Sequence, residues 1–479
     1  MDLELASPFT LPCGLTMPNR LAKAAMAEGW GDKDKLPQKG LVEAYGSWAD
    51  GAWGLVMTGN VQVDEAYLGT PDDNAVNAGI PRDQLLASWR EWAASCSRSG
   101  TPTIVQLNHP GRQSMPGAGS HGFLGKTMAP SVVPVRLGDG LVARLLSALV
   151  FGSPREMDAH DIRHVVARFV EGARLAHDAG FAGIQIHAAH GYLLAQFLSP
   201  RTNRRTDAYG GSPRNRARIV LDILEAVRGA VPRDFCVGIK LNSVDHQSRV
   251  ELDECVEQLE AIAAAGVDFL EISGGTYENP EMMSGKVDPG PLVSERTAAR
   301  EAFFIEFAHA IRDRFKGVPL MLTGGFRSRR GMEAAIRDGA CDLVGIGRPA
   351  VLDPQLPKNT IFNKDVNDDE ARLYAKRVAP SWLNSLLGIK SIAGSAEITR
   401  SIRHPVHSSA IANRHDMTQL RDIQDADDLG YRYYNVMGLS AADSLNNADT
   451  HALFANDVYA GCHGSVATSA AEAVAIGSR

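Results

Sequence analysis

The stretch that decides the fold runs from residue 183 to residue 242 and reads GIQIHAAHGYLLAQFLSPRTNRRTDAYGGSPRNRARIVLDILEAVRGAVPRDFCVGIKLN. It opens on a short, mostly apolar run at 183–187 and ends on a second such run at 236–241. Between them, Ser212 followed by Pro213 marks a helix start, because serine caps helix N-termini and proline is tolerated in the first helical turn. Two buried strands joined by a helix are typical of a parallel β/α/β unit.

The same alternation extends in both directions from this unit. Eight short apolar runs are candidate strands, at 21–26, 55–58, 103–107, 183–187, 236–241, 269–273, 320–323 and 343–347. Apolar residues recur at helical spacing after Asp158 and after Glu251. Gly180, Gly266 and Gly339 stand where helices are expected to end, since a left-handed cap favours a residue without a β-carbon.

Repeated β/α units predict an α/β fold, and we expect a closed (β/α)8 TIM barrel. The competing fold, a doubly wound sheet, usually carries G-x-G-x-x-G after its first strand, and this chain lacks that motif. We expect the barrel to span residues 1–355, with a lid-like insertion rich in glycine and proline at 113–157. Residues 356–402 are predicted to form helices that close the barrel, and 403–479 form a C-terminal tail to which we assign no fold.

Composition excludes several classes of protein. The chain has 479 residues, 44% hydrophobic and 22% charged, with a formal net charge of −7, as in globular proteins. Without a basic stripe, nucleic acid is not an expected partner. The acidic N-terminus and the lack of a long apolar stretch predict a cytoplasmic protein without a membrane span, while a homo-oligomer stays open. The scattered cysteines predict reduced thiols and no metal site; they are Cys13, Cys96, Cys236, Cys255, Cys341 and Cys462.

In a (β/α)8 barrel the active site lies at the C-terminal ends of the strands, so the residues that follow 183–187 are candidates for the active site. His187 and His190 stand three residues apart there, and Tyr192 follows. Two imidazole N–H groups that converge on one point can hold a carbonyl or phenolate oxygen, and a neighbouring phenol can donate a proton. The alternative is that two histidines and a tyrosine merely pack in the core.

The motif HAAHGYLLAQFLSP (187–200), followed by RTDAYGGSPRNR (205–216), resembles the old yellow enzyme family of flavin-dependent reductases. The resemblance spans roughly residues 5–355. It includes PNRLAKAAM (18–26), VQLNHPGR (105–112), GIKLNS (238–243), TGGFRS (323–328) and GIGRP (345–349), in the family's order and spacing. It implies that His187, His190 and Tyr192 are catalytic.

The resemblance also implies an FMN site made of two groups of residues. Those expected near the flavin ring are Ala24, Ala25, Met26, Ala27, Asn60, Gln106 and Lys240, and those at the phosphate are Gly324, Gly325, Gly347 and Arg348. Glycine turns leave backbone N–H groups open to a phosphate, and Arg348 adds charge. Lys240 replaces the arginine that the family usually carries, which keeps the positive charge but loses the guanidinium fork.

Two positions depart from the family. Relatives usually carry Thr or Cys where Ala27 stands, and one branch carries Tyr at the position of Gly29. The resemblance implies NAD(P)H as reductant and a small-molecule enone as substrate, hence ene-reductase activity. One rival keeps the flavin barrel and adds an iron–sulfur cluster, which needs clustered cysteines that this chain lacks. The other rival is a catalytically degenerate barrel that binds FMN or another phosphate ligand.

Overall fold

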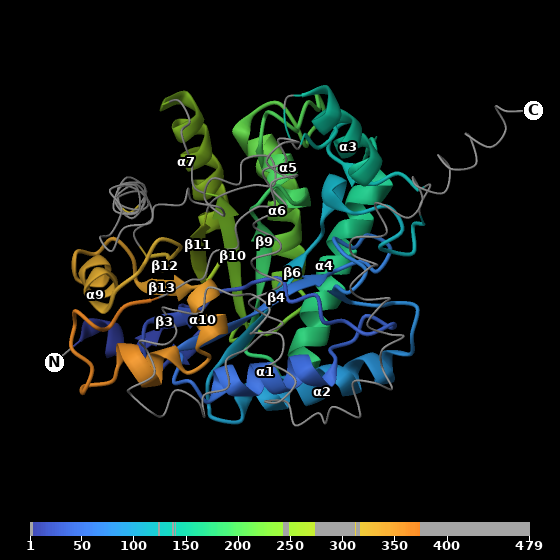
Figure 1. Ribbon diagram of the computed structural model, residues 1–479. Helices are drawn as coiled ribbons and strands as arrows, with labels where there is room; N and C mark the ends of the chain where they lie inside the picture. The colour runs from blue at the N-terminus through green and yellow to red at the C-terminus, as the bar shows by residue number, and fades with distance from the viewer. Residues whose placement is uncertain are drawn as a thin grey trace, which may run out of the picture. The chain divides into compact units, whose positions relative to one another are not determined.

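The computed structural model describes residues 3–122, 125–136, 138, 140–242, 249–273, 312 and 317–373. Within them, eight parallel strands form a ring in chain order, and the last strand pairs with the first (Figure 1). These strands are β3 (Leu21–Lys23), β4 (Leu55–Gln62), β6 (Thr103–Asn108), β9 (Gly183–Ala188), β10 (Cys236–Asn242), β11 (Phe269–Ser273), β12 (Leu320–Thr323) and β13 (Leu343–Ile346). The predicted (β/α)8 barrel is confirmed.

All eight predicted strands form, and the ends of β3 and β4 differ most from the prediction. β3 stops at Lys23, and the chain then runs close to β4. A β-carbon on Gly59 would lie 2.0 Å from the Met26 carbonyl oxygen and 1.9 Å from Glu28 Oε2, so this approach requires glycine. β4 continues to Gln62 across an irregularity in its register with β6 that begins at Met57.

Helices lie outside the strands, and their ends follow the predicted signals. They are α1 (Lys39–Ala49), α2 (Arg82–Ser97), α4 (Ala159–Ala179), α5 (Leu193–Leu198), α6 (Pro213–Arg228), α7 (Arg249–Ala264), α9 (Arg329–Arg337) and α10 (Arg348–Leu352). Asp158 forms a capping box at the start of α4, and Ser212 caps α6 through the Asn215 N–H. Gly180 ends α4 with φ +95°. None of the described helices combines the length and apolar character that crossing a bilayer requires.

Apolar side chains fill the N-terminal half of the barrel interior, and a hairpin covers this end. β1 (Phe9–Thr10) and β2 (Thr16–Met17) form the hairpin, whose Leu11 and Met17 join the interior cluster. The strands contribute Leu55, Met57, Ile104, Cys236, Phe269, Met321 and Leu343 to the same cluster. A second, larger cluster packs the outward side chains of the strands against the helices.

The insertion between β6 and α4 has structure of its own. Its described part contains the 3-10 turn η2 (Gly111–Gln113), a two-stranded sheet of β7 (Met128–Ala129) and β8 (Arg155–Glu156), and α3 (Leu141–Phe151). Arg112 donates hydrogen bonds to the carbonyls of Val133 and Pro134. Because Arg112 follows β6, these bonds anchor the insertion near the C-terminal ends of the strands. The predicted helical closure beyond residue 373 and the tail at 403–479 lie outside the described residues.

Candidate active site

The predicted site residues share one end of the barrel. Parallel strands place their C-terminal ends together. Ala24, Ala25, Met26 and Ala27 follow β3, Asn60 lies near the end of β4, Gln106 lies in β6, His187 in β9 and Lys240 in β10, while Gly324, Gly325, Gly347 and Arg348 follow β12 and β13. His190 and Tyr192 lie in the turn after β9. The structure therefore brings the two predicted groups of residues to the same end of the fold.

The turn after β9 sets the positions of His190 and Tyr192. His190 has φ +57° and Gly191 has φ +74°, so two successive residues adopt the left-handed conformation. That conformation is strained for a histidine. The backbone N–H of His190 donates to Asn242 Oδ1 at 2.9 Å, which fixes the turn to the end of β10. Tyr192 then takes the N-cap position of α5.

The three side chains lie against one another. His187 Nε2 and His190 Nδ1 are 3.2 Å apart, and the His187 and Tyr192 rings meet edge to face with centroids 4.9 Å apart. His190 Nε2 lies 3.2 Å from Ser273 Oγ, and Asn60 Nδ2 donates to Tyr192 Oη at 3.1 Å. From the sequence, we expected the two imidazole N–H groups to converge on one oxygen. In the structure the two rings hydrogen-bond to each other, so an incoming oxygen must replace that bond.

The hydrogen bonds indicate which nitrogens carry protons. The Ala189 N–H donates to His187 Nδ1 at 3.2 Å, so the neutral His187 ring carries its proton on Nε2. That proton is directed at His190 Nδ1. The Ser273 hydroxyl can donate or accept, so it accommodates either tautomer of His190. His190 can therefore accept from His187 in one tautomer and present its own Nδ1–H in the other.

Both imidazoles are held neutral. Burial, helped by the neighbouring His190 and Lys240, lowers the pKa of His187 well below its usual range. Burial and the nearby Lys240 lower the pKa of His190 to about 3. The pair thus offers N–H donors without a formal charge at neutral pH, which suits an oxygen that becomes negative only during a reaction.

A chain of buried polar side chains crosses the barrel interior just inside this end. Gln106 Nε2 donates to Gln185 Oε1 at 2.7 Å, and Gln185 Nε2 donates to Glu271 Oε2 at 2.6 Å. Lys240 Nζ forms an ion pair with Glu271 Oε1 at 2.8 Å. All four residues are almost completely buried, so this network fixes both Gln106 and Lys240.

A second buried ion pair supports the segment after β3. Lys23 Nζ lies 3.4 Å from Glu28 Oε1 and donates to the Met57 carbonyl at 3.0 Å. Tyr45 Oη donates to Glu28 Oε1 at 2.5 Å, and Lys23 Nζ lies 4.4 Å from the centroid of the Trp48 ring. These contacts tie Ala24–Ala27 to β4 and α1, which keeps this segment in place along the mouth.

The glycine turns after β12 and β13 have the features expected of a phosphate site. Gly324 and Gly325 have φ +121° and φ +82°, which favour glycine and leave their backbone amides unobstructed by a side chain. Thr323 Oγ1 is buried without a hydrogen-bond partner among the described residues. Gly347 caps the short helix α10, and Arg348 is its first residue. An anion here would meet backbone N–H groups and the unpaired threonine hydroxyl.

Several residues of the site were missed from the sequence. Gln185 and Glu271 are polar positions inside the apolar runs IQI and FLEIS, a signal that was available, because buried polar residues need partners. Asn242 and Ser273 lie at strand ends, where function concentrates. No local pattern in the sequence marks the contacts of Lys23, because Glu28 lies in the segment after β3 and Tyr45 lies in α1.

Comparisons with known proteins agree with this geometry. Residues 4–365 match the NADH:flavin oxidoreductase / NADH oxidase family. The NADH-dependent flavin oxidoreductase iccE of Talaromyces variabilis is 52% identical over 393 residues, covering 82% of this chain and 94% of that protein. The relative iliE of Hypocrea jecorina, with the same description, is 50% identical over 392 residues, covering 82% and 97%. The structure of the old yellow enzyme homologue of Zymomonas mobilis has the same fold, with a TM-score of 0.61 at 23% identity over 76% of this chain and 94% of that one. The chain belongs to the NADH:flavin oxidoreductase family, the family of the old yellow enzymes.

Proposed function

We propose that this chain is an FMN-dependent reductase of the C=C bond of α,β-unsaturated carbonyl compounds, with NAD(P)H as hydride source. The observation that carries the proposal is the contact between His187, His190 and Tyr192 at the mouth of the barrel. The two neutral imidazoles and the phenol lie in contact with one another. This arrangement suits a reaction in which a substrate oxygen is polarised and a substrate carbon is protonated. The names of the relatives favour NADH as the nicotinamide.

The residues present fit FMN. The orphaned Thr323 hydroxyl and the turns at Gly324, Gly325 and Gly347 would hold the phosphate together with Arg348. Small or half-buried side chains at Ala25–Ala27 leave a surface for the flavin ring, which Gln106 and Lys240 would border. When bound, FMN supplies the hydride chemistry, accepting from the nicotinamide and donating to the alkene.

The imidazoles would hold the substrate carbonyl oxygen. His187 already directs Nε2–H into the space between the rings. His190 would contribute Nδ1–H in the tautomer in which its Nε2 accepts from the Ser273 hydroxyl. Negative charge develops on the substrate oxygen as hydride reaches the β-carbon, and two donors at that oxygen lower the barrier.

Tyr192 would deliver the proton to the α-carbon. Its ring is packed against His187, so the hydroxyl is kept near an oxygen that the histidines hold. The Asn60 amide donates to Tyr192 Oη, and that bond strengthens as the phenol gives up its proton. Lys240 would favour negative charge on the reduced cofactor, while its pairing with Glu271 limits that effect.

The test follows the flavin absorbance of the purified protein during anaerobic reduction and reoxidation. A yellow preparation that NADH or NADPH bleaches under argon, and that 2-cyclohexenone recolours, supports the proposal. The rival is a catalytically degenerate barrel, which would bind FMN or phosphate without turning over. A yellow protein that is bleached but not recoloured by any enone in a series of graded size contradicts the enone assignment, and a colourless protein that takes up no FMN contradicts flavin binding.

A further inference from the structure

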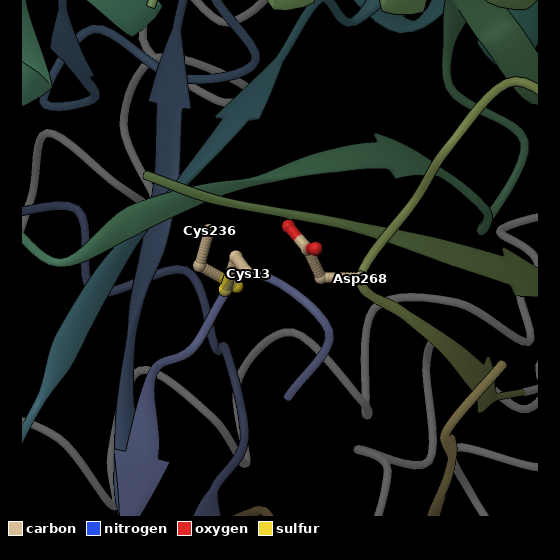
Figure 2. A group of neighbouring side chains, drawn as sticks. All are labelled: Cys13, Cys236 and Asp268. Carbon is tan, nitrogen blue, oxygen red and sulfur yellow. The ribbon is translucent and has the colours of Figure 1, made fainter. Parts of the chain in front are cut away.

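Two cysteines lie together at the N-terminal end of the barrel, opposite the candidate active site. Cys13 lies in the turn of the β1–β2 hairpin, Cys236 is the first residue of β10, and Asp268 directly precedes β11 (Figure 2). The two sulfur atoms and a carboxylate oxygen of Asp268 all lie within 4.8 Å of one another. The hairpin thus brings a thiol from the start of the chain against a thiol inside the barrel.

The two thiols differ in access and in acidity. Cys13 is half-buried between the exposed residues Pro12 and Gly14, while Cys236 is fully buried. The hydrogen bond from the Cys236 thiol lowers the pKa of Cys13, although burial opposes this. The same hydrogen bond and burial raise the pKa of Cys236 well above its usual range. Cys13 is therefore the more acidic and the more accessible of the two thiols, which favours it as the attacking sulfur.

The carboxylate of Asp268 is already engaged, which argues against a metal ion between these groups. Asp268 Oδ2 accepts from Arg228 Nη2 at 2.6 Å and from the Val237 N–H at 2.7 Å. A metal would need this carboxylate, and the Arg228 guanidinium beside it would repel a cation. The feature that remains to be explained is the close approach of the Cys13 and Cys236 sulfur atoms.

We propose that Cys13 and Cys236 are an oxidisable dithiol that forms a reversible disulfide on exposure to a hydroperoxide. The Cys13 thiolate attacks the peroxide, forming an S–O bond and breaking the O–O bond, which yields Cys13 sulfenic acid and releases hydroxide from hydrogen peroxide or an alkoxide from an organic hydroperoxide. The Cys236 sulfur then attacks the sulfenic sulfur, forming the S–S bond and releasing water with the thiol proton. Overall the two thiols lose two electrons, and the hydroperoxide is reduced to water or to an alcohol and water.

The disulfide would join the N-terminal hairpin to a barrel strand. Leu11 and Met17 of the hairpin already cover the apolar interior cluster, and the new bond would prevent the hairpin from detaching. Because the two cysteines are far apart in the sequence, the cross-link closes a long loop and restricts the unfolded chain strongly. Oxidation is therefore expected to raise the melting temperature rather than to change the active site.

The experiment treats the reduced full-length protein with a small excess of hydrogen peroxide and then counts thiols and maps peptides. The expected result is loss of two of the six thiols, a peptide pair joined through Cys13 and Cys236, recovery on adding dithiothreitol, and a melting temperature higher by several degrees in the oxidised form. Cys236→Ser should instead accumulate a sulfenic acid at Cys13 that dimedone traps.

Matched variants make the outcome decisive. Cys341→Ser removes another buried thiol that does not contact the pair, so it should still form the disulfide. Cys13→Ser, at a half-buried turn, should abolish both the cross-link and the shift in melting temperature. A Cys13 that stays reduced under peroxide, or that pairs with any cysteine other than Cys236, would overturn the proposal. So would retention of both thiols while the reduced protein binds zinc through them.

Discussion

The two halves of the barrel interior differ within two residues of the same strand. In β11 the inward side chain changes from Phe269 to Glu271, and in β6 from Ile104 to Gln106. The first layer is apolar and is covered by the hairpin, while the second is polar and is satisfied by partners on neighbouring strands. Burying an ion pair such as Lys240–Glu271 can cost more free energy in lost hydration than the pairing returns. The difference teaches that the N-terminal half has the composition of a stabilising core, whereas the C-terminal half keeps the polar groups that the proposed chemistry would use.

The largest effect is expected from Tyr192→Phe, which removes one hydroxyl from the polar end. The ring keeps its packing against His187, so the fold and flavin binding should not change. Reoxidation of the reduced flavin by 2-cyclohexenone should slow by about 10²–10⁴-fold, the usual contribution of general acid catalysis. Stopped-flow measurement of each half-reaction checks this, and reduction by the nicotinamide should stay nearly unchanged.

Two comparisons sharpen that result. Asn60→Ala keeps the Tyr192 hydroxyl and removes only the donor to its oxygen, so it should slow reoxidation far less. A quinone acceptor needs no protonation at carbon and should reoxidise Tyr192→Phe at close to the normal rate. Equal slowing of both half-reactions would mean that Tyr192 has a structural role, and unchanged reoxidation by the enone would mean that another group supplies the proton.

The opposite result is expected in the apolar half. Phe269→Ala leaves a cavity in the interior cluster and should lower the free energy of unfolding by about 3–5 kcal/mol. The protein that remains folded should still bind flavin and turn over, because Phe269 does not reach the mouth. Denaturant unfolding of the holoprotein measures the loss.

The matched control lies on the same face of the same strand. Ser273→Ala removes a hydrogen bond to His190 and should cost only about 1 kcal/mol in unfolding free energy, but it should weaken binding of a phenolic ligand. If Phe269→Ala impaired turnover more than Ser273→Ala did, the division of the barrel into a stabilising half and a catalytic half would be wrong.

A somewhat smaller effect is expected from the histidines taken singly. His187→Ala or His190→Ala removes one donor and should weaken binding of a phenol, or slow the enone reaction, on the order of 100-fold, while FMN stays bound. His190→Asn keeps a side-chain N–H donor and should recover part of the loss. Charge-transfer absorbance during titration with a phenol reports the affinity. If both alanine variants bind the phenol as tightly as the wild-type protein does, the assigned role is wrong.

The sequence predicted the fold better than it predicted the contacts. Eight apolar runs were enough to place every barrel strand, because strands buried on both faces leave a continuous apolar signal. The catalytic roles of His187, His190 and Tyr192 stay predictions, which rest on their spacing and on the family resemblance, while the structure shows that the three side chains lie against one another. The ends of β3 and β4 were predicted less accurately than their positions. They depend on the close approach of Met26 to Gly59, which joins two segments far apart in the chain.

The partners of the site residues depend on strand register, which the sequence alone does not fix. Glu271 lies beside Lys240 because β10 and β11 pair in that register, and Gln185 lies beside Gln106 for the same reason in β9 and β6. A shift by one residue would turn these side chains to the other face. The mutual hydrogen bond of the two imidazoles was also missed, because it depends on the left-handed conformation of His190.

The smallest effect is expected from pH. An ordinary histidine would change its charge near pH 6.5, but burial lowers the pKa of His190 to about 3 and that of His187 well below its usual range. Both rings therefore stay neutral from pH 8 to pH 5, although Lys240, Glu271 and Tyr192 surround them. The rate of reoxidation by 2-cyclohexenone should change by less than about threefold over this range, and stopped-flow traces at several pH values measure it.

The free energy of unfolding, unlike the rate, is expected to depend on pH. The same lowered pKa values therefore have two consequences that can be measured separately. In the unfolded chain these histidines take up protons below about pH 6.5, whereas the folded protein resists protonation until the pH is much lower. The free energy of unfolding should therefore fall as the pH is lowered from 6.5 towards 4, and it should fall less in His190→Asn. A rate inflection near pH 6.5 that disappears in His190→Asn would show that the imidazole titrates normally, and that the mouth of the barrel is more hydrated than its contacts indicate.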